Sequence, residues 1–311
     1  MGRKLRVTAA VAAIVLAGGA VTYWAVAQRD AEPPDLRGFA RHEVASADGT
    51  TISYLSVGAG PGVIVLPGAL TVAADYADFA RSLAAHYTVH VVDRRGHGAS
   101  GPQGEHYSVE KEVADVAAVQ AGTGADLLVG HSFGGFVGLE TARRRSGFTR
   151  IALYEPGVSI DGSLSTGWMT QAERDLADGA DLDALTDFVR GTSPESAGTP
   201  HWLLKPILPM VIERNVRRQM YDLLPAAIRE HRELARLDTT YHDYARITAP
   251  VLLIRGSESD SSSDHAAAQL AGVIPHATRI TLAGLDHFGP DQTGPAQVAQ
   301  AVTEFFGAAP S

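Results

Sequence analysis

The 311-residue chain contains no cysteine, and it has fewer basic than acidic residues. Without cysteine, neither a disulfide framework nor a thiolate metal site can form. Lysine and arginine number 26 against 35 aspartate and glutamate residues, which gives a formal net charge of −9. This balance argues against nucleic acid or anionic lipid as a partner, because both bind positively charged surfaces. It places no restriction on a small neutral substrate, which is the partner that we expect.

The chain begins with three basic residues among its first six, followed by an uncharged run over residues 7–27. The run ends in Ala25-Val26-Ala27, a pattern typical of signal-peptide cleavage sites. As a helix of about 32 Å it would also be long enough to cross a bilayer. We therefore expect residues 1–27 to be a signal peptide or an N-terminal membrane anchor. The many alanines make the run only moderately hydrophobic, which favours a cleaved signal peptide. Both alternatives predict an exported protein whose catalytic domain lies outside the cytoplasm, with the membrane as a partner only if the segment is retained.

Hydrophobic residues make up 45% of the chain, enough for one domain core with an insertion. Strand-like and helical patterns alternate over residues 39–156 and 250–311, which predicts an α/β fold with a mostly parallel sheet covered by helices on both faces. Ligands bind such sheets beyond the carboxyl ends of the strands. Strands are expected at 39–47, 51–57, 62–66, 88–92, 127–130, 151–154, 251–255 and 278–282, and helices at 73–85, 109–121, 133–145, 265–271 and 296–306.

The alternation stops over residues 157–249, where helical patterns predominate and no clear strand is found. We expect a helical insertion there, a linker at 28–38, and a core domain formed by 39–156 and 250–311. Most apolar side chains of the insertion should pack inside the protein, and a few should line an apolar substrate pocket. Helices are expected at 172–178, 182–190, 211–223 and 226–237, and the apolar residues in question are Trp168, Met169, Trp202, Leu203, Leu204, Ile207, Leu208 and Met210.

The most informative motif is Gly130-x-Ser132-x-Gly134, between a buried apolar strand and a helical pattern. A serine hydroxyl is a weak nucleophile, and it reacts only when a strained turn presents it beside a base and oxyanion donors. Glycines two residues before and after the serine leave room where a strand reverses sharply into a helix. Ser132 is therefore a candidate nucleophile. The alternative is an inert serine in a glycine-rich turn.

Three further segments accompany this turn. Residues 63–69 form an apolar strand ending in Pro67-Gly68-Ala69, residues 91–100 read V-V-D-R-R-G-H-G-A-S, and residues 282–289 contain His287 in a glycine-rich turn. In this order and spacing, the four segments resemble the α/β-hydrolase family over about residues 44–306. The resemblance implies an eight-stranded type of sheet and a helical lid formed by the insertion. It also implies that Asp93, Arg95 and Ser100 brace a loop and have no catalytic role.

The resemblance further implies site residues. Ser132 would be the nucleophile and His287 the base, because the family places its histidine after the last strand. The backbone amides of Ala69 and Phe133 would form the oxyanion hole. Pro67 stands where relatives often have histidine, and it leaves the Ala69 amide free. No metal or other cofactor is expected, because no histidine pair shows ligand spacing with a carboxylate.

The acid of the triad is open. Many related hydrolases carry an aspartate after the seventh strand, but Ser259 occupies that position here, flanked by Glu258 and Asp260. Glu155 closes the sixth strand, and this position resembles the one where haloalkane dehalogenases carry the acid of their triad. A carboxylate there could stabilise the imidazolium equally well. We expect Glu155 as the acid, with Asp260 as the alternative and Glu258 after it.

Together these residues predict a serine hydrolase that cleaves an ester-type acyl bond of a small hydrophobic substrate. A serine at position 132 argues against dehalogenase and epoxide hydrolase chemistry, which requires an aspartate nucleophile in similar folds. Carbon–carbon bond hydrolysis, peroxy-acid formation and acyl transfer can use the same constellation. A protein with this fold can also bind a ligand without catalysis, since fold alone does not determine function.

Overall fold

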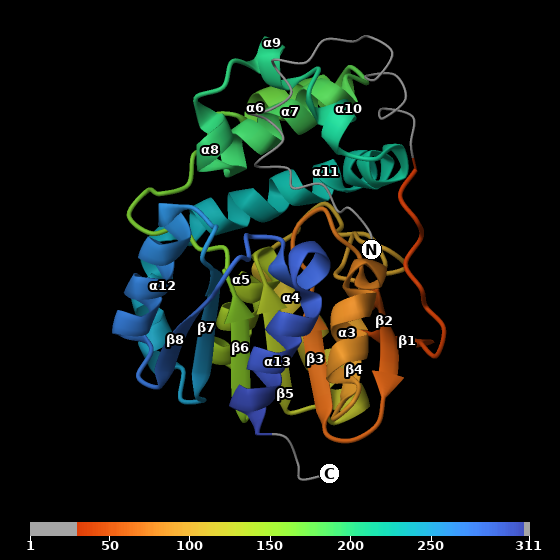
Figure 1. Ribbon diagram of the computed structural model, residues 1–311, viewed down its shortest axis with the longest axis vertical. Coiled ribbons are helices and arrows are strands. Elements are labelled where there is room, and N and C mark those ends of the chain that lie inside the picture. The colour runs from red at the N-terminus through yellow and green to blue at the C-terminus, as the bar shows by residue number, and fades with distance from the viewer. Residues whose placement is uncertain (1–29, 308–311) are drawn as a thin grey trace. The chain divides into compact units, whose positions relative to one another are not determined.

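The computed structural model describes residues 30–307, and Figure 1 shows how their helices and strands are arranged. The predicted signal peptide or anchor at residues 1–27 lies outside the described part of the chain. Within residues 30–307, no helix is both long enough and apolar enough to cross a bilayer.

One compact unit contains an eight-stranded sheet and spans Pro34–Ser163 together with the chain from Arg232 onward. The strand order is β1-β2-β4-β3-β5-β6-β7-β8. β1 and β2 form an antiparallel hairpin, β2 pairs antiparallel with β4, and all further pairs are parallel, so the predicted mostly parallel sheet is confirmed. The strands are β1 (Ala40–Ala45), β2 (Thr51–Gly58), β3 (Gly62–Leu66), β4 (Thr88–Val92), β5 (Leu127–His131), β6 (Arg150–Tyr154), β7 (Val251–Gly256) and β8 (Ala277–Leu282).

Burial of the strands follows their position in the sheet. All five residues of β5 are buried, whereas no residue of the edge strands β1 and β8 is buried. A parallel sheet covered on both faces needs nearly continuous apolar strands, which explains why β3 to β7 read as short apolar runs in the sequence. Because β3, β5, β6 and β7 run parallel to one another, their carboxyl ends lie along one edge of the sheet, where the candidate site is found.

Helices cover both faces of this sheet (Figure 1). α3 and α13 pack on one face, where Phe79, Leu83, Val298 and Val302 join the sheet residues in one apolar core. α4 and α5 lie on the opposite face. The elements of this unit are η2 (Ala73–Tyr76), α3 (Ala77–Leu83), α4 (Val109–Thr123), α5 (Phe133–Arg144), η3 (Asp238–Arg246), α12 (Ser261–Val273), the π-helix η4 (Gly289–Thr293) and α13 (Pro295–Phe306).

The second compact unit comprises residues 30–33 and Leu164–His231, so it is helical but shorter than the expected insertion at 157–249. The residues on either side of Leu164–His231 belong to the sheet unit. There the Asp238 carboxylate accepts hydrogen bonds from the Ser159 hydroxyl and, at 3.0 Å, from the Gly162 amide. The helices of the insertion are α6 (Met169–Ala177), α7 (Asp181–Thr192), α8 (Pro194–Ala197), α9 (His201–Leu204), α10 (Leu208–Val211) and α11 (Arg214–Arg236), whose end from Arg232 onward belongs to the sheet unit.

The expected break between helices at 211–223 and 226–237 was wrong. α11 runs without interruption from Arg214 to Arg236 with Pro225 inside it. Proline removes one helical hydrogen bond, but most helical stability in proteins comes from packing of an apolar face. Leu223, Leu224, Ala227 and Ile228 are buried around the proline, and this packing keeps the helix continuous.

The turn from β5 into α5 depends on a very close approach of backbones. A Cβ atom at Gly134 would lie 2.1 Å from the carbonyl oxygen of Leu66 and 2.5 Å from that of Pro67. At Gly138, one turn further along the same helix, a Cβ would meet only the side-chain methyls of Leu128 and Leu153, at 3.3 Å. The backbone contact therefore requires glycine at position 134, whereas position 138 faces only side chains that can move.

We predict that Gly134→Ala lowers the free energy of unfolding by about 3 kcal/mol or more, because rigid backbone cannot move aside. Gly138→Ala should stay within about 1 kcal/mol of the wild type, since methyl groups can shift and alanine favours the helix. Urea unfolding followed by circular dichroism measures both values. Equal losses in the two variants would contradict the role assigned to the close approach.

Candidate active site

Ser132 lies at the tip of the turn between β5 and α5 in a backbone conformation that residues other than glycine rarely adopt. Its φ is 51° and its ψ is −121°. Such strain persists only where the surroundings hold the residue in place. The Ser132 amide donates to the Tyr154 carbonyl at 3.1 Å, and the Ser132 carbonyl accepts from the Gly157 amide at 2.8 Å. The last residue of β6 and the loop after it therefore hold the strained turn.

His287 lies in the loop after β8, and its imidazole reaches the serine from 155 positions away in the sequence. Nε2 is 3.1 Å from Ser132 Oγ, and Nδ1 is 2.8 Å from Glu155 Oε2. A carboxylate accepts only, so Nδ1 carries a proton and Nε2 of the neutral ring is free to accept the serine proton. The structure thus brings Ser132, His287 and Glu155 into one hydrogen-bonded line.

Glu155 follows β6 directly and adopts a positive φ of 43°. Its side chain is only 2% exposed. Oε1 accepts a hydrogen bond from the Gly256 amide at 2.9 Å and another from the Ser259 hydroxyl. Ser259 occupies the position where the resemblance led us to look for an aspartate. Its hydroxyl instead supports the carboxylate that comes from the neighbouring strand.

The other two candidate acids, Asp260 and Glu258, take part in the structure of the loop after β7. Asp260 is the N-cap of α12, and its carboxylate accepts from the amides of Ser262 at 2.8 Å and Ser263 at 3.1 Å. This cap explains why α12 begins at Ser261, ahead of the expected start at residue 265. Glu258 anchors the same loop through its backbone amide, which donates to the Leu285 carbonyl at 2.8 Å. Of the three candidates, the structure brings Glu155 against His287 Nδ1.

Glu155 and His287 shift each other's pKa in opposite directions. Burial acts to lower the pKa of His287, but the hydrogen bond and negative charge of Glu155 outweigh it, so this pKa lies above its usual value of 6.5. Burial acts to raise the pKa of Glu155. The hydrogen bond and charge of His287, together with the hydrogen bonds from Ser259 and Gly256, nevertheless hold this pKa below its usual range. Glu155 therefore stays ionised wherever His287 acts as a base.

Two backbone segments next to Ser132 carry the amides expected to form the oxyanion hole. Phe133 is the first residue of α5, so its amide has no acceptor inside the helix and lies at the positive end of the helix dipole. Ala69 lies in the turn after β3, next to Gly68. A Cβ on Gly68 would lie 3.3 Å from the Cβ of Ser132, which places this turn directly against the serine.

A buried chain of hydrogen bonds joins this turn to the histidine loop. The Gly68 amide donates to Tyr76 Oη at 3.0 Å, Tyr76 Oη is 2.5 Å from His131 Nδ1, and His131 Nε2 is 2.8 Å from the His287 carbonyl. A carbonyl can only accept, so His131 Nε2 carries the proton and the tyrosine hydroxyl donates to Nδ1. Burial lowers the pKa of His131 to about 3, which keeps the ring neutral. Each hydrogen bond of the series then has one fixed donor and one fixed acceptor.

Three residues of the site were not assigned from the sequence. Ser259 was recognised only as a departure from the expected acid, and Tyr76 and Arg94 were given no role. Arg94 lies within the D-x-R-G loop, where its guanidinium donates to the carbonyls of Pro67 and Gly68, each at 3.0 Å. The only available signal was its place in that loop, because nothing local shows which backbone atoms a buried arginine contacts.

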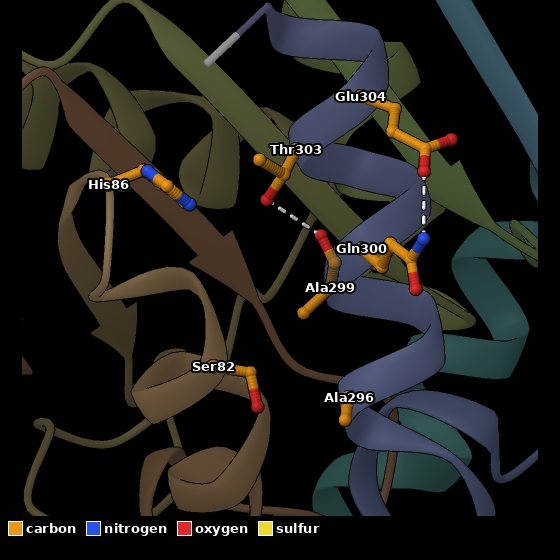
Figure 2. A pocket seen from close by; sticks show the side chains of 7 residues that line it. All are labelled: Ser82, His86, Ala296, Ala299, Gln300, Thr303 and Glu304. Carbon is orange, nitrogen blue, oxygen red and sulfur yellow. Dashed lines mark hydrogen bonds between the residues drawn. The ribbon is translucent and has the colours of Figure 1, made fainter. Parts of the chain in front are cut away.

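A separate groove lies between α3 and α13, with a volume of about 250 Å³ (Figure 2). Ser82 and His86 line one side, and Gln300, Thr303 and Glu304 lie along α13. None of the residues around Ser132 contributes to it, so it is not part of the candidate site. Within residues 30–307, no cluster of three or more histidine or acidic residues could hold a metal ion.

Residues 63–301 match the sequence model of the alpha/beta hydrolase family. The chain belongs to this family. It is 29% identical over 265 residues to a pimeloyl-(acyl-carrier protein) methyl ester esterase of Xanthomonas campestris pv. campestris (strain B100), covering 82% of this chain and 98% of that protein. A 2-(acetamidomethylene)succinate hydrolase of Mesorhizobium japonicum is 23% identical over 276 residues, covering 83% and 92%.

Solved structures agree with this assignment. An alpha/beta hydrolase from Sphaerobacter thermophilus superimposes with a TM-score of 0.73 at 31% identity, covering 85% of this chain and all of that one. The family resemblance and the α/β-hydrolase fold expected from the sequence are thereby confirmed. The relatives are named as esterases and other hydrolases, so the protein is a hydrolase of this family.

We predict that Glu155→Gln lowers the rate of serine acylation on the order of 10³-fold, because an amide no longer stabilises the imidazolium. It should also move the acidic limb of the pH–rate profile to lower pH. As the expected base, His287 must be neutral, and Glu155 is what raises the pKa of that residue above 6.5. Stopped-flow measurements with an aryl ester across pH give both quantities.

The matched control is Asp260→Asn, which keeps a good helix cap and leaves His287 Nδ1 in contact with Glu155. Its acylation rate should remain within about threefold of the wild type. A large loss in Asp260→Asn with little change in Glu155→Gln would reverse the assignment of the acid.

Proposed function

We propose that the protein is a serine hydrolase that cleaves an ester-type acyl bond of a small hydrophobic substrate through Ser132, His287 and Glu155. The observation that carries this proposal is the continuous line from Glu155 Oε2 to His287 Nδ1 at 2.8 Å and from His287 Nε2 to Ser132 Oγ at 3.1 Å. A nucleophile, a base within hydrogen-bonding reach and a group orienting that base are together the signature of covalent acyl transfer.

In the first half of the reaction, His287 Nε2 takes the proton of Ser132 while Oγ attacks the substrate carbonyl carbon. The tetrahedral intermediate collapses when its C–O bond breaks, and the imidazolium gives its proton to the departing alcohol. In the second half, His287 takes a proton from water, whose oxygen attacks the acyl-enzyme. The acid is released as the Ser132 oxygen recovers its proton. Glu155 stabilises the positive ring during both halves.

The oxyanion formed in each half would be bound by the amides of Ala69 and Phe133. Donors aligned in this way contribute roughly 3 kcal/mol each to stabilisation of the transition state. The helix N-terminus at Phe133 adds a favourable dipole for the same negative charge. Fixed donors need no rearrangement when the charge appears, so the rigidity of both turns supports acyl chemistry.

One relative is a methyl ester esterase, which supports an ester as the substrate. The hydrophobic character is inferred from the apolar side chains of the insertion, among which Trp202 is 75% exposed. Carbon–carbon hydrolysis, peroxy-acid formation and acyl transfer would use the same serine and differ in the bond broken or in the group that accepts the acyl chain. Product analysis with carboxylic esters distinguishes ester hydrolysis from these reactions.

The test is labelling of the protein with a fluorophosphonate, together with hydrolysis of p-nitrophenyl acetate, butyrate and octanoate. Wild-type protein should be labelled and should prefer a longer acyl chain to acetate, and Ser132→Ala should lose labelling and at least about 10³-fold in kcat. If the wild type is not labelled, or if Ser132→Ala reacts equally well, the proposal fails. A wild type that is neither labelled nor hydrolyses any of the three esters indicates a ligand-binding protein, whereas an equally reactive Ser132→Ala indicates a different nucleophile.

We further propose that residues 1–27 export the protein, as a cleaved signal peptide or as a retained anchor. Full-length protein expressed in bacteria should be recovered outside the cytoplasm, with Gln28 as the new N-terminus if cleavage occurs or in the membrane fraction if it does not. A chain lacking residues 1–27 should stay in the cytoplasm. Recovery of the intact full-length chain from the cytoplasm would contradict export.

A further inference from the structure

Arg94 is a buried guanidinium that contacts the proposed oxyanion turn on its protein side. Its side chain is 1% exposed. Nε donates to the carbonyl of Pro67 and Nη2 to that of Gly68, each at 3.0 Å. Its Cζ lies over the ring of Phe133, 4.8 Å from the ring centroid. One side chain thus touches both segments that supply the proposed oxyanion donors.

The contact with Gly68 determines the direction of the next amide. The carbonyl of Gly68 and the N–H of Ala69 belong to a single planar peptide unit, and in a trans peptide they point in opposite directions. Holding the Gly68 oxygen toward Arg94 therefore aims the Ala69 N–H away from it. A free turn could rotate this unit, and the hydrogen would then miss the oxyanion.

Additional hydrogen bonds hold the same turn. The hydroxyl of Thr71 also donates to the Gly68 carbonyl, at 2.9 Å, and the Gly68 amide donates to Tyr76 Oη at 3.0 Å. The two peptide units on either side of Gly68 are consequently both anchored. Among these donors only Arg94 carries a charge, and charge-assisted hydrogen bonds are roughly twice as strong as neutral ones.

The charge has a second effect on the amide. A cation bound to a peptide oxygen withdraws electron density from the peptide unit, and hydrogen bonds in such a chain strengthen one another in a low-dielectric interior. The Ala69 N–H thereby becomes a better donor. The buried charge is balanced by Glu112, whose Oε1 is 2.9 Å from Arg94 Nη1 and also accepts from Tyr107 Oη at 2.6 Å.

We propose that Arg94 is a positioning residue that aims and polarises the Ala69 amide for the oxyanion of the acyl-transfer reaction. This inference rests on the proposed serine hydrolase function. It assigns no contact between Arg94 and the substrate. The guanidinium acts through the peptide unit that lies between it and the reacting carbonyl.

The adjacent residue provides a matched control. Arg95 is equally buried, belongs to the same loop and pairs with a buried carboxylate, Asp115 at 2.6 Å, and with Asp48 at 2.9 Å. Its hydrogen bonds to Asp115, Asp48, Ser46 and the Lys111 carbonyl are with residues outside the oxyanion turn. Replacing either arginine removes a buried bidentate cation, so the two variants share the structural cost. Only one of them loses contact with the Gly68 carbonyl.

The experiment compares Arg94→Lys and Arg95→Lys at a temperature where both are folded by circular dichroism. The kinetic readout is hydrolysis of p-nitrophenyl butyrate. Inhibition by propyl trifluoromethyl ketone supplies the second readout, because addition of Ser132 to this ketone creates an oxyanion with the same acyl chain. Lysine keeps the charge but cannot reproduce the two-pronged contact. The pH–rate profile reports separately on His287.

For Arg94→Lys we expect kcat to fall about 10- to 100-fold with KM nearly unchanged, and the affinity for the ketone to fall by a similar factor. The acidic limb of the pH profile should not move, because Glu155 and His287 are untouched. For Arg95→Lys both readouts should stay within about twofold of the wild type. A loss of stability alone would not reproduce this difference between the two variants.

Equal kinetic losses in the two variants would overturn the inference, as would a loss of kcat in Arg94→Lys without a loss of ketone affinity. If Arg94→Lys does not fold, Thr71→Val removes the other donor to the same carbonyl. It should then lower kcat and ketone affinity together by a few-fold, and an unchanged ketone affinity would count against the inference. A wild-type protein that hydrolyses no ester overturns the proposed function itself, which is a separate result.

Discussion

The structure depends on one close backbone contact, that of the Gly134 turn with the carbonyl oxygens at the end of β3. No side chain fits there, since a Cβ would lie 2.1 Å from the Leu66 oxygen. This contact lets the chain reverse from β5 into α5 within a single residue, which leaves Ser132 with a positive φ and its hydroxyl at the edge of the sheet. It also brings the turn after β3 against the serine, so the same contact positions both proposed oxyanion donors.

The acid illustrates how a parallel sheet allows more than one solution to the same requirement. β6 and β7 are neighbours and run in the same direction, so the loops after them meet at one edge. A carboxylate from either loop can face the imidazole that arrives after β8. Here Glu155 comes from β6, while Gly256 and Ser259 of the β7 loop donate hydrogen bonds to it. The loop that lacks the aspartate expected from the resemblance has thereby become the support for a carboxylate from the adjacent strand.

Around this line of three residues, buried polar groups hold backbone atoms. Tyr76 and His131 connect the Gly68 amide with the carbonyl of His287 through neutral hydrogen bonds of fixed direction. Arg94 holds the carbonyl side of the same turn. Buried polar groups are costly unless every one is bonded, and a fully bonded network restricts the chain to one arrangement. The proposed oxyanion turn and the histidine loop, which lie more than 200 residues apart in sequence, are therefore linked through the protein interior.

The sequence by itself determined the α/β architecture, because apolar strands and amphipathic helices are local patterns; the expected strands at 62–66 and 88–92 coincide with β3 and β4. The glycine pattern around Ser132 likewise reflects a steric requirement that acts within five residues. What only the tertiary structure decided depends on distant partners. It decided which of three carboxylates meets His287, and that α11 continues through Pro225 because the surrounding residues are buried. It also decided that Arg94 reaches the Gly68 carbonyl, since a long flexible side chain gives no sign in its sequence neighbourhood of the atoms it will contact.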